Sequence, residues 1–311
     1  MGLARWRFVQ QPEIVVMKLF GFYIVKLWAD FLSVHPFWLL YMKSDVYRFL
    51  LYHVLRYRRK VVRENLLRSF PGKDAKAIKT IERRFYRNLC DQFVEAPKML
   101  RMGPTGYRNR VTFSNPELAQ QLYEQKKNVF YAIPHSGNWE WFGKLIPELS
   151  PHKGLAIYKK VQNSAFERLM LEMRTKDCQL EMVESNFALK RLAQLRGELN
   201  SVLMMADQSP RGVDSDYWTE FLHQDTCWFT GLERISKMLD YAVVFVDMKR
   251  VGRGRYEVGF ELLASDPKAM GKNELMERYV RRVEQFILGE PDNWLWSHRR
   301  WKHSRNQNVE R

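Results

Sequence analysis

The chain has 311 residues, of which 46% are hydrophobic and 14% aromatic, and its net charge at pH 7 is +16. This composition excludes a disordered protein and is sufficient for one large buried core. The three cysteines, Cys90, Cys178 and Cys227, are far apart and form no CxxC pair. We therefore expect reduced thiols, and neither a disulfide framework nor a zinc site.

The positive charge is concentrated at the two ends of the chain. Residues 1–71 carry a net charge of +8 and residues 294–311 a net charge of +4, which leaves only +4 for residues 72–293. Proteins that bind nucleic acid usually spread basic residues along the binding body, so we expect no nucleic-acid partner. Basic ends beside aromatic stretches favour an anionic membrane surface, where each cation contributes roughly 1 kcal/mol.

The N-terminal stretch 14–42 is rich in aromatic and aliphatic residues but is interrupted by Lys18, Lys26 and Asp30. Its longest part without a charged residue, 31–42, is shorter than the ~20 apolar residues that a membrane span needs. We also expect no signal peptide, because no small-residue cleavage site follows a compact apolar run. Helices lying in the membrane interface are favoured; core helices and a single span are the alternatives. We therefore expect a membrane-interface helical segment over residues 1–71, followed by an α/β domain.

Within 72–311, helical periodicity alternates with short apolar runs of strand length. The pattern predicts helices over 74–100, 117–127, 139–149, 166–176, 186–199, 229–239 and 272–288. It predicts strands over 128–134, 154–158, 201–206, 241–248 and 255–263. Such alternation indicates an α/β fold with a mostly parallel sheet flanked by helices, with the last two strands as an antiparallel hairpin.

Sites in sheets of this kind lie at the carboxyl ends of the strands. Three polar clusters are predicted there, which are His135–Glu140, Lys159–Lys160 and Asp207–Gln208. The first cluster places a histidine five residues before a glutamate, in a turn that contains Gly137 and Asn138. In a catalytic interpretation, Glu140 fixes the imidazole tautomer and His135 removes a proton from an attacking hydroxyl. In a structural interpretation, His135 is a satisfied histidine and Glu140 stabilises a helix N-terminus.

The segment HSGNWE resembles the HxxxxE/D dyad of the bacterial lipid A biosynthesis late acyltransferases, the lauroyl/myristoyl transferase family. Three further blocks resemble the same family and occur in its order: RYRRKVVRENLLRSFP at 56–71, the span 204–229, and WLWSHRRWK at 294–302. The resemblance covers the chain from about Val25. One position departs from the family, because Tyr158-Lys159-Lys160 stands where Tyr-Arg-Pro is expected, and Lys cannot make the planar bidentate pair of Arg.

The resemblance implies an α/β core similar to that of glycerol-3-phosphate acyltransferase. It implies transfer of a fatty acyl group from an acyl carrier protein thioester, or less often coenzyme A, to a hydroxyl of a lipid A precursor. The reaction is expected at the cytoplasmic face of the inner membrane, with no metal and no cofactor. His135 corresponds to the general base and Glu140 to its orienting partner.

Other residues are weaker candidates for substrate contacts. Asn138, Lys159, Lys160, Asp207, Gln208 and Arg299 are expected to contact substrate, with solvated side chains or helix caps as the alternative interpretation. Arg300 and Lys302, with the neighbouring tryptophans, are expected at the membrane interface. A basic cluster at Arg56, Arg58, Arg59, Lys60 and Arg63 is a candidate docking surface for an acidic carrier protein.

Two other functions remain open on the sequence. The first is an O-acyltransferase for a lysophospholipid or an aminolipid, on the same fold and with the same motif. The second is a basic protein without catalytic activity that binds a membrane or a nucleic acid, for which binding to single-stranded DNA would depend steeply on salt.

Overall fold

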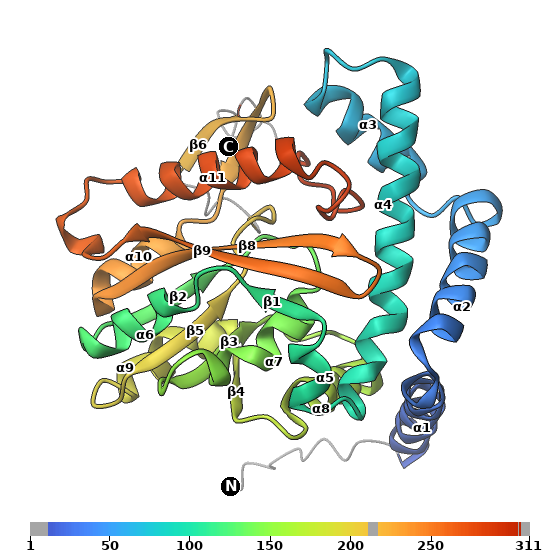
Figure 1. Cartoon of the computed structure of the whole chain (residues 1–311), viewed down its shortest axis with the longest axis horizontal. Coiled ribbons are helices and arrows are strands. Elements are labelled where there is room, and N and C mark those ends of the chain that lie inside the picture. The colour runs from blue at the N-terminus through green and yellow to red at the C-terminus, as the bar shows by residue number, and fades with distance from the viewer. Residues whose placement is uncertain (1–11, 211–216, 304, 306–311) are drawn as a thin grey trace, which may run out of the picture.

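The protein is built around a seven-stranded sheet in the computed structural model, which describes residues 12–210, 217–303 and 305, and side chains from residue 21 onward. The strands follow the order β1-β9-β8-β2-β5-β3-β4 (Figure 1). All neighbouring pairs are parallel except β8–β9, which confirms the predicted parallel sheet and its hairpin. The strands are β1 (Val111–Phe113), β2 (Asn128–Ala132), β3 (Lys153–Tyr158), β4 (Leu180–Glu184), β5 (Asn200–Met204), β8 (Tyr241–Gly252) and β9 (Arg255–Ala264).

Helices precede the sheet and cover both of its faces (Figure 1). The N-terminal helices are α1 (Pro12–Val34), α2 (Phe37–Phe49), the π-helical η1 (Leu50–Val54), α3 (Arg59–Ser69), α4 (Ala75–Glu95) and the 3-10 helix η2 (Ala96–Leu100). The remaining helices, which run from just before β1 to after β9, are α5 (Pro104–Arg108), α6 (Glu117–Glu124), α7 (Trp139–Leu149), α8 (Ser164–Thr175), η3 (Ser185–Phe187), α9 (Ala188–Gln194), α10 (Gly231–Leu239), η4 (Pro267–Ala269) and α11 (Glu274–Gly289). A separate antiparallel hairpin is formed by β6 (Tyr217–Phe221) and β7 (Gln224–Trp228).

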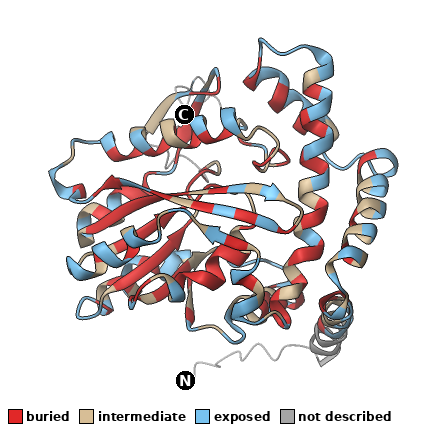
Figure 2. Cartoon of the chain, in the orientation of Figure 1, coloured by how far each residue is buried: buried red, intermediate tan, exposed pale blue. Residues whose placement is uncertain are grey.

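Strand side chains alternate between two hydrophobic cores, one on each face of the sheet. In β2, Val129 and Tyr131 belong to the core under α1, α5, α6, α7 and α8, whereas Phe130 and Ala132 belong to the core under α3, α4, α9, α10 and α11. This is the two-residue period of a strand that is buried on both faces. Figure 2 shows the resulting continuous burial of the central strands.

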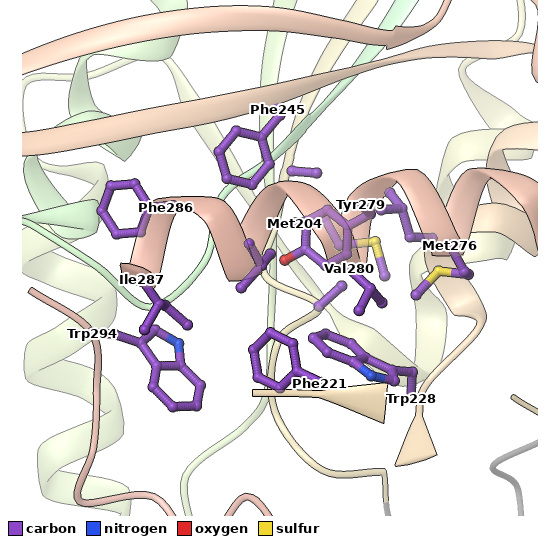
Figure 3. Close-up of a cluster of buried hydrophobic side chains, with 14 of the residues drawn as sticks. Met204, Phe221, Trp228, Phe245, Met276, Tyr279, Val280, Phe286, Ile287 and Trp294 are labelled. Carbon is purple, nitrogen blue, oxygen red and sulfur yellow. The ribbon is translucent and has the colours of Figure 1, made fainter. Parts of the chain in front are cut away.

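The second core extends from the sheet to the β6–β7 hairpin and the C-terminal segment. Figure 3 shows Phe221 and Trp228 of the hairpin below Tyr279 of α11, with Trp294 beside Ile287. The Phe221 ring centroid lies 5.0 Å from that of Trp228 and 6.1 Å from that of Trp294. These aromatic contacts fix the C-terminal segment against the body of the domain.

The N-terminal helices pack on the domain through one side and leave an apolar side exposed. α2 lies along α4, and Phe22 and Ala29 of α1 are buried in the first core. No helix in the described part of the chain combines the length and hydropathy needed to cross a bilayer. The domain division at residue 71 stays a prediction.

Some elements differ from those predicted. The predicted helix 186–199 is only α9, preceded by the 3-10 turn η3, and the predicted strand 128–134 ends at Ala132. The short strands β1, β4, β6 and β7 were not predicted. β1 has three residues, and β4 carries Glu181 and Glu184 among its five residues, so neither offers a clear apolar run.

Candidate active site

His135 lies in the turn that leads from β2 to α7. Asn138 caps this helix, since its Oδ1 accepts a hydrogen bond from the backbone N–H of Trp141 at 3.1 Å. Gly137 has a φ of +57°, and a Cβ atom there would lie 2.9 Å from the backbone oxygen of Met248. The turn therefore requires glycine at this position.

The acid that contacts the imidazole is Asp207, which follows β5. Its Oδ1 lies 2.6 Å from Nδ1 of His135, and its Oδ2 accepts hydrogen bonds from the His135 backbone N–H at 2.9 Å and from Nε1 of Trp294 at 2.8 Å. β2 and β5 are parallel neighbours, with Ala132 opposite Met204, so the residues that follow them meet at one sheet edge. The carboxylate thereby fixes both the position and the tautomer of the imidazole.

Asp207 is ionised in this environment. Burial alone would raise its pKa, but the electrostatic interaction with His135 and the hydrogen bonds from His135 and Trp294 lower the pKa to about 2. The side chain of Asp207 is 1% exposed, whereas that of His135 is 15% exposed. In the His135–Asp207 pair, the carboxylate is therefore buried and the imidazole is partly exposed and lines a pocket.

His135 lines that pocket together with Trp139 and Trp294. It has a volume of about 330 Å³, including space open to solvent, and its walls include Asn88 and Gln92 of α4, Arg250 and Asn293. Nε2 of Gln208 lies 3.1 Å from Nε2 of His135. The unanchored nitrogen therefore contacts a polar side chain that a substrate hydroxyl can replace.

Glu140 is not the residue that holds Nδ1, in contrast to the sequence-based prediction. Its Oε1 and Oε2 accept hydrogen bonds from Nη2 and Nε of Arg174 at 2.6 and 2.8 Å, and Oε1 also accepts from Nε1 of Trp139 at 3.3 Å. The Trp139 ring lies against the His135 ring, at 5.2 Å between centroids. Glu140 therefore contacts Trp139, which packs on the imidazole, whereas Asp207 contacts the imidazole directly.

A second pocket, of about 370 Å³ including open space, is also lined by Trp139. Glu140, Tyr158 and Arg174 line one part of it. Lys144, whose ammonium group donates to the carbonyl oxygen of Lys176, also lines it. The rest of its lining is apolar: Gly143, Ala156, Ile157, Leu180, Met182, Leu203 and Met205. Trp139 is the residue that lines both pockets, the polar pocket at His135 and this apolar pocket.

The remaining predicted site residues are divided in the structure. Gln208 lies at the imidazole, whereas Asn138 is fully buried beneath the turn. Lys159, Lys160 and Arg299 are exposed and line neither of the two pockets. Their predicted contact with substrate stays a prediction.

The turn between β2 and α7 is hydrogen-bonded to α4. The sequence did not indicate that α4 contacts the site. Glu95 is fully buried and accepts hydrogen bonds from Nδ2 of Asn138 at 2.8 Å, from the Tyr256 hydroxyl at 2.7 Å and from the Tyr41 hydroxyl at 3.1 Å. Burial raises the pKa of Glu95, and the hydrogen bonds from Tyr256 and Asn138 oppose that rise. One carboxyl group thus joins α2, the β8–β9 hairpin and the catalytic turn.

Further hydrogen bonds fix the backbone of Gly137. Nε2 of Gln92 donates to its carbonyl oxygen at 2.9 Å, and Oδ1 of Asn293 accepts from its N–H at 3.0 Å. Ser136 forms a backbone bridge with Trp294. The C-terminal block is therefore part of the support of the site, which its aromatic composition alone did not reveal.

Arg300 was expected at the membrane interface, and this expectation is wrong. It is fully buried, its guanidinium lies 4.2 Å from the ring centroid of Trp228, and burial lowers its pKa to about 10. Its three side-chain nitrogens are buried, and the neighbouring Cys227 and Asp207 side chains oppose the lowering of its pKa. The hydroxyl of Ser209 donates to its carbonyl oxygen at 2.6 Å, which ties this segment to the loop after Asp207.

In the part of the chain that the structure describes, no group of three or more His, Cys, Asp or Glu side chains is placed to hold a metal ion. The sequence model of the family described as bacterial lipid A biosynthesis acyltransferase matches residues 10–303, which is nearly the whole chain. None of the curated proteins compared with the chain matches it.

Proposed function

Because the chain belongs to the bacterial lipid A biosynthesis acyltransferase family and is an acyltransferase, we propose that it acylates a hydroxyl of a lipid A precursor with His135 as the general base. The acyl donor in this proposal is a thioester of acyl carrier protein or coenzyme A. The observation that carries the proposal is that Asp207 holds Nδ1 of the imidazole of His135, a residue that lines a pocket.

The proposed reaction has one base and no covalent enzyme intermediate. Asp207 accepts a hydrogen bond from Nδ1–H, which leaves the lone pair of Nε2 of His135 free to remove the proton of the acceptor hydroxyl. The hydroxyl oxygen attacks the thioester carbonyl carbon, the carbon–sulfur bond of the tetrahedral intermediate breaks, and the departing thiolate takes the proton from the imidazolium. Asp207 stabilises that imidazolium while it exists. These steps require only groups of the protein and its two substrates.

Gln208 occupies the place of the acceptor hydroxyl before substrate binds. Its amide nitrogen is at hydrogen-bond distance from Nε2 of His135, and an incoming hydroxyl replaces this contact. The displaced amide remains beside the reacting atoms. It is then available to hold the acceptor oxygen.

The oxyanion is proposed to bind at the start of α7. The backbone N–H groups of Ser136 and Gly137 already donate to Pro134 and Asn293, so the candidates are the N–H groups of Asn138 and Trp139. A helix N-terminus also carries a partial positive charge that favours an anion.

We propose that Glu140 acts indirectly on the reaction. Its pair with Arg174 fixes the carboxylate, which in turn holds the Trp139 indole against the imidazole. This replaces the direct orienting role that the family resemblance implied. The apolar pocket that Trp139 also lines is the proposed site of the acyl chain, where burial contributes roughly 0.8 kcal/mol per methylene.

The proposed location is the cytoplasmic face of the inner membrane, with the N-terminal helices lying in the interface. Their outward side is a strip of exposed apolar side chains, in which Leu27 is 72% and Trp38 64% exposed. The strip comprises Tyr23, Ile24, Leu27, Phe31, Val34, Trp38, Met42, Val46, Phe49, Leu50, Val54 and Leu55. Contiguous apolar surface of this kind usually marks a membrane or partner contact.

The proposal is tested by acyl transfer from acyl carrier protein to a lipid A precursor, with the product identified by mass spectrometry. His135→Ala should lower kcat by about 10²–10⁴, and Glu140→Ala should also slow the reaction. His53→Ala, at an exposed histidine that lines neither pocket, is the matched control. Wild-type activity in folded His135→Ala, or transfer only to a lysophospholipid or aminolipid, would contradict the proposal.

A further inference from the structure

One side of α4 carries a series of exposed basic side chains. The exposed side chains along this helix and the turn before it include six cations, here called the α4 basic face: Lys73, Lys76, Lys79, Arg83, Arg84 and Arg87. Two acids lie in the same stretch. Asp74 caps the helix through the backbone N–H of Ala77, and Glu82 is buried and paired with Arg59 and Arg63. The face therefore has a strong uncompensated positive charge.

Cations elsewhere on the protein are often neutralised by neighbours. On α11, Arg278 pairs with Glu274 at 2.8 Å and Arg281 pairs with Glu277 at 2.7 Å. Among the residues that the structure describes, no acidic side chain forms a salt bridge with any member of the α4 basic face. Uncompensated charge of one sign attracts a partner of the opposite sign and accelerates its association.

The face is purely polar, which distinguishes it from the apolar strip. Residues 68–92 are all described, and none of their large hydrophobic side chains is exposed. Membrane-binding helices combine cations with exposed aromatic or aliphatic side chains. A cationic face without such side chains instead fits the surface of an acidic soluble protein.

The same helix forms one wall of the polar pocket. Phe85, Asn88, Leu89 and Gln92 line that pocket, and Arg84 lies one helical turn before Asn88. The side chain of Asn88 donates to the carbonyl oxygen of Asp292 at 2.9 Å, which joins α4 to the far wall. A partner seated on the α4 basic face is therefore adjacent to the opening that leads to His135.

We propose that the α4 basic face is the docking surface for an acidic protein that carries the acyl group as a thioester. The inference rests on the proposed function and makes a protein, rather than a small thioester, the preferred donor. It also relocates the docking surface predicted from the sequence, because Arg59 and Arg63 are engaged by Glu82 and Arg58 donates to the carbonyl oxygen of Ser297.

The test compares two donors with the same acyl chain, acyl carrier protein and uncharged acyl-pantetheine. In R83E/R84E/R87E, kcat/KM for the carrier protein should fall about 10–100-fold at low salt, and the deficit should shrink as salt increases. The rate with acyl-pantetheine should change no more than about twofold, because none of the three residues lines a pocket.

The matched control is K190E/R196E/K268E, which makes the same charge change at exposed cations outside the helix. It should leave both rates near those of the wild type. Equal slowing with both donors, or equal slowing by the control, would overturn the docking proposal while the proposed function stands. A wild-type enzyme that uses neither donor would instead overturn the proposed function.

Sedimentation with anionic phosphatidylglycerol vesicles separates a protein partner from a membrane. The R83E/R84E/R87E variant should bind these vesicles as the wild type does, since the apolar strip is intact. Loss of vesicle binding together with equal slowing for both donors would assign the face to the membrane and contradict the proposal.

Discussion

Asp207 lies 72 positions after His135 in the sequence, yet its Oδ1 is 2.6 Å from Nδ1 of the imidazole. The contact exists because β2 and β5 are parallel neighbours that end at the same edge of the sheet. The Asp207 carboxylate also accepts from the His135 backbone and from Trp294, so a single side chain fixes the imidazole, its backbone and the C-terminal segment.

Asp207→Asn should lower kcat by about 10²–10⁴ with little change in KM, because an amide does not hold the Nδ1–H tautomer as the carboxylate does. Steady-state kinetics with a soluble thioester donor provides the measurement, and circular dichroism verifies the fold. Asp225→Asn, at an exposed aspartate that lines neither pocket, is the control. An unchanged kcat in folded Asp207→Asn would show that this contact is not required for catalysis.

The stability of the protein should depend on Asp207 in acid. Its pKa is about 2 in the folded protein and 3.8 without perturbation, so its ionised form favours folding. The contribution is complete above pH 4 and is lost as the pH falls towards 2, with a total on the order of 2 kcal/mol. Urea unfolding of the wild type and Asp207→Asn between pH 5 and 2.5 should show a stability difference that shrinks over this window. A constant difference would contradict the assignment.

Glu95→Ala should destabilise the protein and slow catalysis together. The substitution leaves Nδ2 of Asn138 and the hydroxyls of Tyr41 and Tyr256 without their acceptor, at a cost of about 1–3 kcal/mol for each group that stays buried. Thermal unfolding and kcat are the two measurements. Tyr41→Phe removes only one donor and should have a much smaller effect on both; an equally large effect would indicate that the three contacts are not shared by one carboxyl group.

Gly137→Ala should reduce activity more than a glycine substitution elsewhere. A Cβ atom at this position would lie 2.8 Å from Cγ of Met248, and the positive φ is unfavourable for alanine by about 1–2 kcal/mol. The turn must then shift, which displaces His135. Gly72→Ala has no atom within 4 Å of the new Cβ and serves as the control in the same kinetic assay. Similar activity of the two variants would argue against a strained requirement for glycine.

Gly143→Val should shorten the preferred acyl chain if the apolar pocket holds it. The new Cβ would lie 3.5 Å from Cδ2 of Leu203, which is ordinary contact, and the two methyl groups beyond it would take pocket volume. Competition between donors of different chain lengths should shift by about tenfold towards the shorter chain. Gly197→Val, in open space, should leave the selectivity unchanged. Unaltered selectivity in Gly143→Val would place the chain elsewhere.

The central sheet was predictable because β2, β5 and β8 are apolar runs bounded by polar turns, which is the pattern of buried parallel strands. The identity of the acid at Nδ1 was not predictable, because the hydrophobic pattern does not specify which strands become neighbours. The five-residue spacing indicated Glu140, but the intervening Trp139 packs on the imidazole and Arg174 takes the carboxylate.

For the C-terminal block, residues 294–302, the sequence likewise did not reveal which side chains are buried. Interleaved Trp and Arg residues are typical of a membrane interface. Here, Trp296 and Arg300 are fully buried, because Ser209 and the β6–β7 hairpin enclose the segment. Composition identified the block as important, but only the tertiary contacts of Trp294 with Asp207 and Ser136 place it beneath the catalytic turn.

The indole of Trp139 is a wall shared by the two pockets. If the acyl chain binds in one pocket and the acceptor in the other, the first substrate to bind fixes the orientation of the indole. The second substrate then binds against the indole in that orientation. Their affinities must then be coupled, and by the same factor in both directions. We expect initial-rate plots in which the apparent KM for one substrate varies with the concentration of the other, and in which Trp139→Ala abolishes that interdependence.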